Sequence, residues 1–343
     1  MNFFGYGCLS LLLLFAVVFS SASGESLHWT LSSPAPDPVS DYAAGVIDGK
    51  LVIAGGTYWT GSKGNWIQKQ FSRSTHALDP RSGVWTTLPD LPVPLGCSAA
   101  AVVGDKLFVL GGFTGSQVNR KIYTLQMQHG VYSWQEFGEV PFDRVYARAV
   151  SVGKLLYLVG GTTRFEPRDP TGTCCTSKTA TRSLMVLDTD HSQKGWQELP
   201  SYPGDLRFYF GAETDGRAVW MFGGIYQARP EDPIVAFHDV SRYDIAKGKW
   251  EQVKPLPEVS REGNSPSPVF VGNGFVLMND SRKVWKLDAA GETYRELTSL
   301  PEAASVDRFV WLNNEIVGAS GENFVQGPRR RSEWVFVGRF DGK

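Results

Sequence analysis

The segment Trp250-Glu-Gln-Val-Lys-Pro-Leu-Pro257 decides how this chain folds, because its pattern recurs along the sequence. An aromatic residue is followed by proline seven positions later at six places: Trp29 and Pro36, Trp85 and Pro92, Trp134 and Pro141, Trp196 and Pro203, Trp250 and Pro257, and Tyr294 and Pro301. A fixed offset at a loose repeat length indicates a repeated supersecondary unit. The sequence therefore predicts six such units.

Each unit is predicted to hold four short antiparallel strands. Upstream of four of the aromatic residues, an apolar run ends in two glycines, as in Ala218-Val-Trp-Met-Phe-Gly-Gly224. Such short apolar runs, bounded by turn residues, favour strands over helices. Dipeptides such as Asp48-Gly49 precede the runs and supply the positive φ of a tight hairpin loop. Four-stranded units repeated around an axis form a β-propeller.

The repeats resemble kelch repeats, which combine an apolar strand, a glycine pair, an aromatic residue near an aspartate (Tyr243 and Asp244) and a tryptophan. The resemblance implies an all-β fold, a six-bladed kelch-type β-propeller over residues 24–343. The last unit ends at Trp334-Val-Phe-Val-Gly-Arg-Phe340, which is typical of a third strand. We therefore expect the N-terminal strand at residues 28–31 to close the last blade beside residues 334–337, which removes an open sheet edge.

Residues 1–23 are predicted to be a signal peptide. Residues 9–18 are apolar apart from Ser10, and small residues follow at 20–24. The apolar stretch is shorter than the roughly 20 residues of a membrane span. No lysine or arginine precedes it, which leaves an uncleaved anchor as the alternative. The expected location is secreted or periplasmic, with no membrane span after signal cleavage.

Charge, cysteine and histidine content narrow the classes of function. The 34 basic and 35 acidic residues give a net charge of −1, so no basic field for nucleic acid exists. Cys97, Cys174 and Cys175 remain after signal removal, and three cysteines do not make a disulfide scaffold. Three alternatives stay open: pairing of Cys97 with one of the other two, a rarer bond between the adjacent Cys174 and Cys175, and free thiols. The five histidines are scattered and none pair at ligand spacing, so no metal site is expected.

Function is expected in loops on one face of the predicted ring. Three long loops between second and third strands, at residues 57–75, 162–182 and 225–239, are of the kind that is usually functional. Arginine-bearing loops between units lie around the same channel mouth and favour an anionic or polyhydroxylated ligand, although single arginines can be structural. The candidate ligand-binding residues are Tyr42, Arg148, Arg164, Arg207, Tyr209 and Arg308.

A motif in the last unit carries the most specific hypothesis. The stretch from Gly321-Glu322 to Arg329-Arg-Arg331 resembles the active-site stretch of the N-acetylneuraminate epimerase (sialic acid mutarotase) family, whose members are exported six-bladed kelch propellers. The resemblance implies that Glu322 is a general base, that Arg329 or Arg331 holds the sugar carboxylate, and that no cofactor is needed. The spacing to Arg329 is one residue longer than in the family, and the motif lies in the final blade.

Two classes of function remain open. One is a carbohydrate epimerase or mutarotase acting on a sugar such as sialic acid. The other is a non-catalytic kelch module that binds a glycan or a protein partner through the same face. Turnover of sialic acid separates the two classes.

Overall fold

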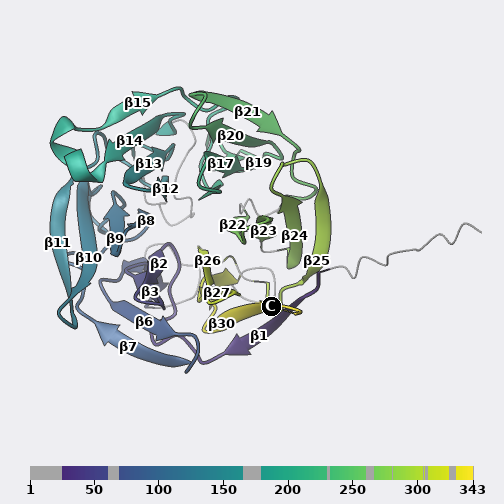
Figure 1. Cartoon of the computed structure of the whole chain (residues 1–343). Helices are drawn as coiled ribbons and strands as arrows, with labels where there is room; N and C mark the ends of the chain where they lie inside the picture. Colours follow the sequence, from purple (N-terminus) through teal and green to yellow (C-terminus); the bar gives the residue numbers. More distant parts are fainter. Residues whose placement is uncertain are drawn as a thin grey trace, which may run out of the picture.

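The computed structural model describes residues 25–60, 69–164, 179–229, 232–259, 266–279, 281–303, 305, 308–323 and 330–342. Six four-stranded antiparallel sheets surround a central axis as the blades of a propeller (Figure 1). The predicted all-β fold and the predicted six blades are both confirmed. In the described part of the chain, no helix is long and apolar enough to cross a membrane.

The blades follow one another along the chain, each with its first strand nearest the axis (Figure 1). From inside to outside they are β2 (Ala43–Ile47), β3 (Lys50–Ala54), β6 (Thr75–Asp79) and β7 (Val84–Leu88); β8 (Ala99–Val103), β9 (Lys106–Leu110), β10 (Lys121–Gln128) and β11 (Val131–Glu139); β12 (Arg148–Val152), β13 (Leu155–Val159), β14 (Leu184–Asp188) and β15 (Gln197–Leu199); β16 (Gly211–Thr214), β17 (Ala218–Phe222), β20 (Val240–Asp244) and β21 (Lys249–Val253); β22 (Ser267–Phe270), β23 (Gly274–Met278), β24 (Lys283–Asp288) and β25 (Tyr294–Ser299); and β26 (Phe309–Leu312), β27 (Glu315–Ala319), β30 (Val335–Phe340) and β1 (Leu27–Ser32).

The sixth blade closes the ring as predicted, with the N-terminal strand as its outer strand. β1 pairs antiparallel with β30, so that Trp29 lies opposite Gly338 and Leu31 opposite Phe336. The partner segment is therefore two residues further along than residues 334–337. The shift places the Trp29 ring over the backbone at Gly338, where an added Cβ would approach the ring to 2.9 Å.

In four of the six blades, the recurring aromatic residue donates a hydrogen bond to the preceding blade. The indole nitrogen of Trp250 donates a hydrogen bond to the carbonyl of Pro200 in the preceding blade at 2.6 Å. Trp134 and Trp196 donate in the same way to carbonyls one blade back, both at 2.9 Å. The phenol of Tyr294 replaces the indole in the fifth blade and donates to Lys254. In these four blades the aromatic residue is both a side chain that fills the wedge and a hydrogen-bond donor between blades.

The glycine pairs stand where the end of a second strand meets the next blade. Gly55 has φ +67°, and a Cβ there would lie 2.2 Å from the carbonyl oxygen of Leu95. The amide of Gly56 donates to that same carbonyl at 2.8 Å. Both the backbone conformation and the close approach therefore demand glycine.

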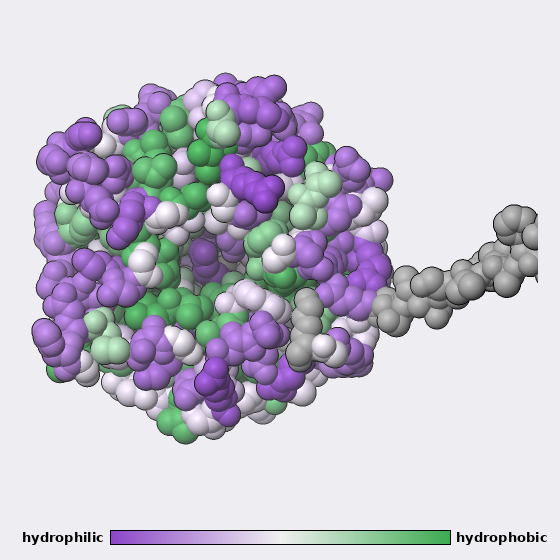
Figure 2. Space-filling view, in the orientation of Figure 1, coloured by the Kyte–Doolittle hydropathy of each residue, from purple (hydrophilic) through white to green (hydrophobic). Residues whose placement is uncertain are grey.

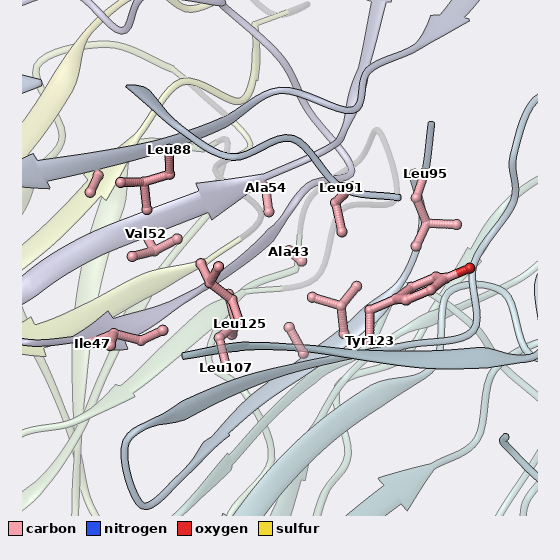
Figure 3. Packing of buried hydrophobic residues seen from close by; sticks show 13 residues of the cluster. Ala43, Ile47, Val52, Ala54, Leu88, Leu91, Leu95, Leu107, Tyr123 and Leu125 are labelled. Atoms are coloured by element: carbon pink, nitrogen blue, oxygen red, sulfur yellow. The ribbon is translucent and has the colours of Figure 1, made fainter. Parts of the chain in front are cut away.

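Apolar side chains fill the wedges between blades, as they do between the first two blades (Figure 3). Val52 and Ile47 from the first blade pack against Leu107 and Leu125 from the second, and all four are buried. Equivalent clusters occupy the other wedges. The apolar core therefore lies between neighbouring blades, and the central axis of the ring contains a channel.

Three short hairpins extend the loops between second and third strands: β4 (Thr57–Trp59) with β5 (Lys69–Phe71), β18 (Ile225–Tyr226) with β19 (Val235–Ala236), and β28 (Glu322–Asn323) with β29 (Arg330–Arg331). The first residue of each hairpin is bridged to the loop that leads into its own blade: Thr57 to Ser40, Ile225 to Phe208, and Glu322 to Ser305. Glu322 therefore occupies the position that threonine or isoleucine fills in the other two blades.

Candidate functional site

The inner strands of all six blades line a central channel, seen as a hollow in the middle of the ring in Figure 2. The main cavity in the channel has a volume of about 280 Å³. Most of its lining is small or apolar, because alanine, glycine and valine let six inner strands converge. The polar part of the lining comes from Ser151, Thr214, Glu213 and Arg308.

Three predicted ligand residues meet at one end of this channel, and each is tied to backbone of another blade. Tyr42, Arg148 and Arg308 line a common space there. The hydroxyl of Tyr42 donates to the carbonyl of Ala319. Arg148 Nε donates to the carbonyl of Phe210 at 3.0 Å, and Arg308 Nη1 donates across the channel to Ala100 at 2.8 Å. These tethers fix the cationic groups at the wall, with Arg308 reaching into both parts of the channel.

Glu213 on β16 is a functional candidate that the sequence reasoning missed. Its Oε2 lies 4.0 Å from Arg308 Nη2, and its Oε1 accepts a hydrogen bond from the amide of Thr214 at 2.9 Å. Burial raises the pKa of the Glu213 carboxyl, and the charge of Arg308 offsets only part of that effect. A lone charge in the small-residue strand Gly211-Ala-Glu-Thr214 was the available signal. We call Glu213 and Arg308 the channel pair.

A second group of charges lies beside the channel mouth, between the hairpins of the first and last blades. Asp41, Lys69, Glu322 and Arg331 form it, and we call it the rim cluster. Arg331 Nη1 lies 3.0 Å from Glu322 Oε2, across the β28–β29 pair in which the two residues are directly opposite. The Arg331 guanidinium also stacks on Trp59, 3.8 Å from the centre of the ring.

Hydrogen bonds continue through Thr57 to the other half of the rim cluster. Arg331 donates from Nη2 to the Thr57 hydroxyl at 2.8 Å and from Nε to the Thr57 carbonyl at 3.0 Å. The Thr57 hydroxyl in turn donates to Asp41 Oδ2 at 2.8 Å. Lys69 pairs with the same oxygen at 2.8 Å, with 4% of its side chain exposed. Two cations and two carboxylates therefore alternate in one buried chain.

The rim cluster changes the acidity of Asp41. Burial alone would raise the pKa of the Asp41 carboxyl, but the charges of Lys69 and Arg331, together with hydrogen bonds from Lys69 and Thr57, lower the pKa to about 2. Asp41 is thus held ionised. Its backbone has φ 58°, a conformation that Asp and Asn tolerate better than most residues.

A groove of about 560 Å³ adjoins the rim cluster, and Arg331 forms part of its wall. Tyr58 and Trp59 from β4 lie along it, with Ser72, Ser74 and Glu333. Aromatic, hydroxyl and charged groups in one concavity suit a polyhydroxylated ligand. Tyr58 is 38% exposed, so its ring is accessible.

The other predicted ligand residues are placed differently. Arg207 is 1% exposed, pairs with Asp239 at 2.7 Å and lies over the Phe237 ring, so it is part of the interior of the fourth blade. Tyr209 is half-buried against the Tyr146 ring. Arg164 is exposed. Arg329, Cys174 and Cys175 lie outside the described residues, as does the expected signal peptide.

The sequence of this chain is similar to those of known kelch proteins. The kelch motif matches residues 38–92, which include the whole first blade. The chain carries a kelch motif. The chain is 35% identical over 169 residues to N-acetylneuraminate epimerase of Vibrio cholerae, covering 46% of this chain and 41% of that protein. It is also 27% identical over 202 residues to N-(sulfonatooxy)prop-2-enimidothioate sulfolyase of Thlaspi arvense, covering 56% and 55%.

A third relative carries only the name of the repeat. Kelch-like protein 34 of Homo sapiens is 23% identical over 236 residues, which cover 67% of this kelch propeller and 33% of that protein. The chain spans about half the length of the curated relatives it matches first, at 55%, 41% and 47%. The similarity therefore extends over part of each relative and supports the resemblance to both epimerases and kelch-like proteins.

The described part of this kelch propeller contains no cluster of side chains suited to bind a metal ion. Among the described residues, no group of three His, Cys, Asp or Glu side chains could hold a metal ion. Cys97 is buried. The rim cluster and the groove present carboxylates, guanidinium groups and aromatic rings.

Proposed function

We propose that the protein is an exported carbohydrate-binding propeller that exchanges the anomers of sialic acid, or of a similar sugar acid, at the rim cluster. The observation that carries the proposal is the pairing of Glu322 with Arg331 at 3.0 Å beside an open groove. Relatives named N-acetylneuraminate epimerase support it, one of them over 63% of this chain at 25% identity.

The proposed reaction needs one proton acceptor and one anion holder. Glu322 takes the proton of the anomeric hydroxyl while the bond between the anomeric carbon and the ring oxygen breaks, and the ring oxygen takes up a proton from solvent water. The open-chain ketone then rotates and recloses on its other face: the attacking hydroxyl returns its proton to water, and Glu322 returns its proton to the new anomeric oxygen. Positioned acid–base catalysis of this kind typically contributes 10²–10⁴-fold.

Arg331 has two tasks in this proposal. It holds the Glu322 carboxylate in place, and its guanidinium presents charge to the groove where the sugar carboxylate binds. The groove volume of about 560 Å³ falls within the range of small-molecule sites. Tyr58 offers an exposed ring for the apolar face of a sugar. Arg329 stays a predicted second clamp.

The test is a proton NMR time course of freshly released α-sialic acid, with wild type, Glu322→Gln and Glu296→Gln. Glu296 lies exposed on β25 in the fifth blade, so its substitution is the matched control. Glu322→Gln keeps the shape of the side chain but cannot accept a proton, so the acceleration should fall by about 10²–10⁴-fold while Glu296→Gln stays at wild-type rate. No acceleration by the wild type removes the enzyme proposal.

A second candidate function is binding without turnover. One observation favours it: the Glu322 carboxylate is already held by Arg331, and 12% of its side chain is exposed, which restricts access of a substrate hydroxyl. Saturation-transfer NMR with sialic acid separates the candidates. Binding by wild type with no acceleration supports the module, and the loss of that binding in Tyr58→Ala would place the ligand in the groove.

Secretion of a chain shortened by about 23 residues, measured by mass spectrometry, tests the export signal.

A further inference from the structure

The channel contains two opposite charges in otherwise small and apolar surroundings. Among the described residues that line its cavity of about 280 Å³, Glu213 and Arg308 are the two with ionisable side chains. Valine and alanine from β2, β8 and β12 and aromatic side chains from β22 and β26 form much of the remaining wall. Charges in such surroundings interact strongly with any ion that enters, because little water competes.

The two charges of the channel pair lie further apart than the charges of two other ion pairs that contain an arginine with a largely buried side chain. Arg308 Nη2 and Glu213 Oε2 are 4.0 Å apart, which is too long for a hydrogen bond. Arg207 and Asp239 meet at 2.7 Å, and Arg331 and Glu322 at 3.0 Å. Arg308 is anchored from its other side, by the carbonyl of Ala100 at 2.8 Å. Its second nitrogen is therefore held toward the cavity without closing on the carboxylate.

Protonation of Glu213 can compensate the negative charge of an anion that enters the channel. A second carboxylate beside ionised Glu213 would be repelled, but a protonated Glu213 becomes a hydrogen-bond donor to that anion. Burial already raises the pKa of the Glu213 carboxyl, which makes proton uptake less costly. Arg308 Nη2, which is held toward the cavity, then donates a charge-assisted hydrogen bond to an oxygen of the anion.

We propose that the channel is a second ligand site, separate from the rim cluster, in which Arg308 binds a small monocarboxylate and Glu213, protonated from solvent, donates a hydrogen bond to it. Net charge is conserved in the site, since one proton and one anion enter together. The site does not depend on the proposed epimerase activity, because none of its groups belongs to the rim cluster.

One titrating group should control this binding. Among the described residues, the charged groups on the strands around Glu213 are Arg308, just ahead of β26, and Arg148 on β12, whose guanidinium is held by the carbonyl of Phe210. β17 and β22, which flank β16, contain no titratable side chain. Binding should therefore couple to a single proton.

The experiment is isothermal titration calorimetry of the whole protein with L-lactate, with its neutral amide as the control probe. Runs at pH 5 to 8 in bis-Tris and in imidazole, which differ in ionisation enthalpy, count the protons taken up. We expect lactate to bind, lactamide not to bind, close to one proton to enter per lactate, and affinity to fall about tenfold per pH unit above the pKa of Glu213.

Variants test the roles of both residues. Glu213→Gln should still bind lactate but lose the proton uptake and the pH dependence, and Arg308→Met should lose binding. Glu322→Gln should bind lactate as wild type does, which separates this site from the proposed enzyme site. Equal binding of lactate and lactamide, no lactate binding by wild type, or an unchanged pH dependence in the soluble, folded Glu213→Gln protein would overturn the proposal.

Discussion

The rim cluster and the channel pair contain the same kinds of side chain, but the pKa of a largely buried carboxyl group shifts in opposite directions in the two places. In the rim cluster, contacts of 2.8 to 3.0 Å join every charge to a partner, and the pKa of Asp41 falls to about 2. In the channel pair, the two charges stay 4.0 Å apart and the pKa of Glu213 rises. The comparison shows that burial alone does not set the pKa of a carboxyl group: nearby cations and hydrogen bonds lower the pKa of Asp41, whereas Arg308 at 4.0 Å leaves the pKa of Glu213 raised.

The largest expected effect is on the rim cluster, where Asp41→Asn removes one charge. Asparagine tolerates the left-handed backbone at φ 58°, so the substitution isolates the charge from the backbone. Lys69, 4% exposed, would then be left without its carboxylate. The free energy of unfolding should fall by about 3–5 kcal/mol, measured by urea denaturation at pH 7.

Asp48→Asn is the matched control for that measurement. Asp48 also has positive φ, at 50°, but it lies in an exposed turn of the same blade, 3.8 Å from Lys50. Its loss should cost less than about 1 kcal/mol, because exposed pairs contribute little. Equal losses in the two variants would show that backbone conformation, and not closure of the rim cluster, sets the stability.

The next effect is a pH dependence of opposite sign in the two regions. The pKa of Asp41 is depressed from 3.8 to about 2 in the folded protein, so its stabilisation is present above the ordinary value and lost as the pH falls through about 2. The difference in unfolding free energy between wild type and Asp41→Asn should therefore shrink by about 2 kcal/mol from pH 5 to pH 2.

The pKa of Glu213 is raised, so its contribution to stability is largest at low pH and is lost as the pH rises through the folded value. Wild type should lose stability relative to Glu213→Gln as the pH rises above the ordinary glutamate range. Denaturation curves of both proteins at pH 4 to 7.5 measure this. A constant difference across that range would mean that Glu213 is no less solvated than in the unfolded chain.

The smallest effect is on stability at neutral pH when Glu213→Gln removes the channel carboxylate. Glutamine avoids the cost of burying a charge, and Arg308 keeps its hydrogen bond to Ala100. The free energy of unfolding should stay within about 1 kcal/mol of wild type or rise. A loss as large as that of Asp41→Asn would erase the distinction between the two regions.

Several features of the fold were readable from the sequence because they arise within one repeat or from the ends of the chain. The spacing from Trp250 to Pro257 marks the outer strand, whose indole binds the preceding blade. The missing last strand predicted closure by β1, and only the two-residue shift toward Gly338 was not foreseen. Glu322 and Arg331, which the sequence placed in one motif, lie opposite each other on one hairpin. Their catalytic roles stay predictions.

Other features depended on residues far apart in the sequence. Arg207 was expected in a ligand face, but Asp239, 32 positions later, binds it within the blade. The sequence did not indicate a role for Lys69, because its partner Asp41 lies 28 positions earlier, in the loop that leads into the blade. Glu213 looked like one polar residue in a short strand until β26 brought Arg308 to it from another blade.

The sequence by itself determined the number of blades, the strands in each blade and the way the ring closes, because local spacing and strand pairing of neighbours control these features. Only the tertiary structure decided which charges meet. Convergence of six inner strands on one axis joins residues such as Glu213 and Arg308, which stand 4.0 Å apart in space and belong to different blades. No local pattern records that contact, since it arises from the curvature of the whole ring.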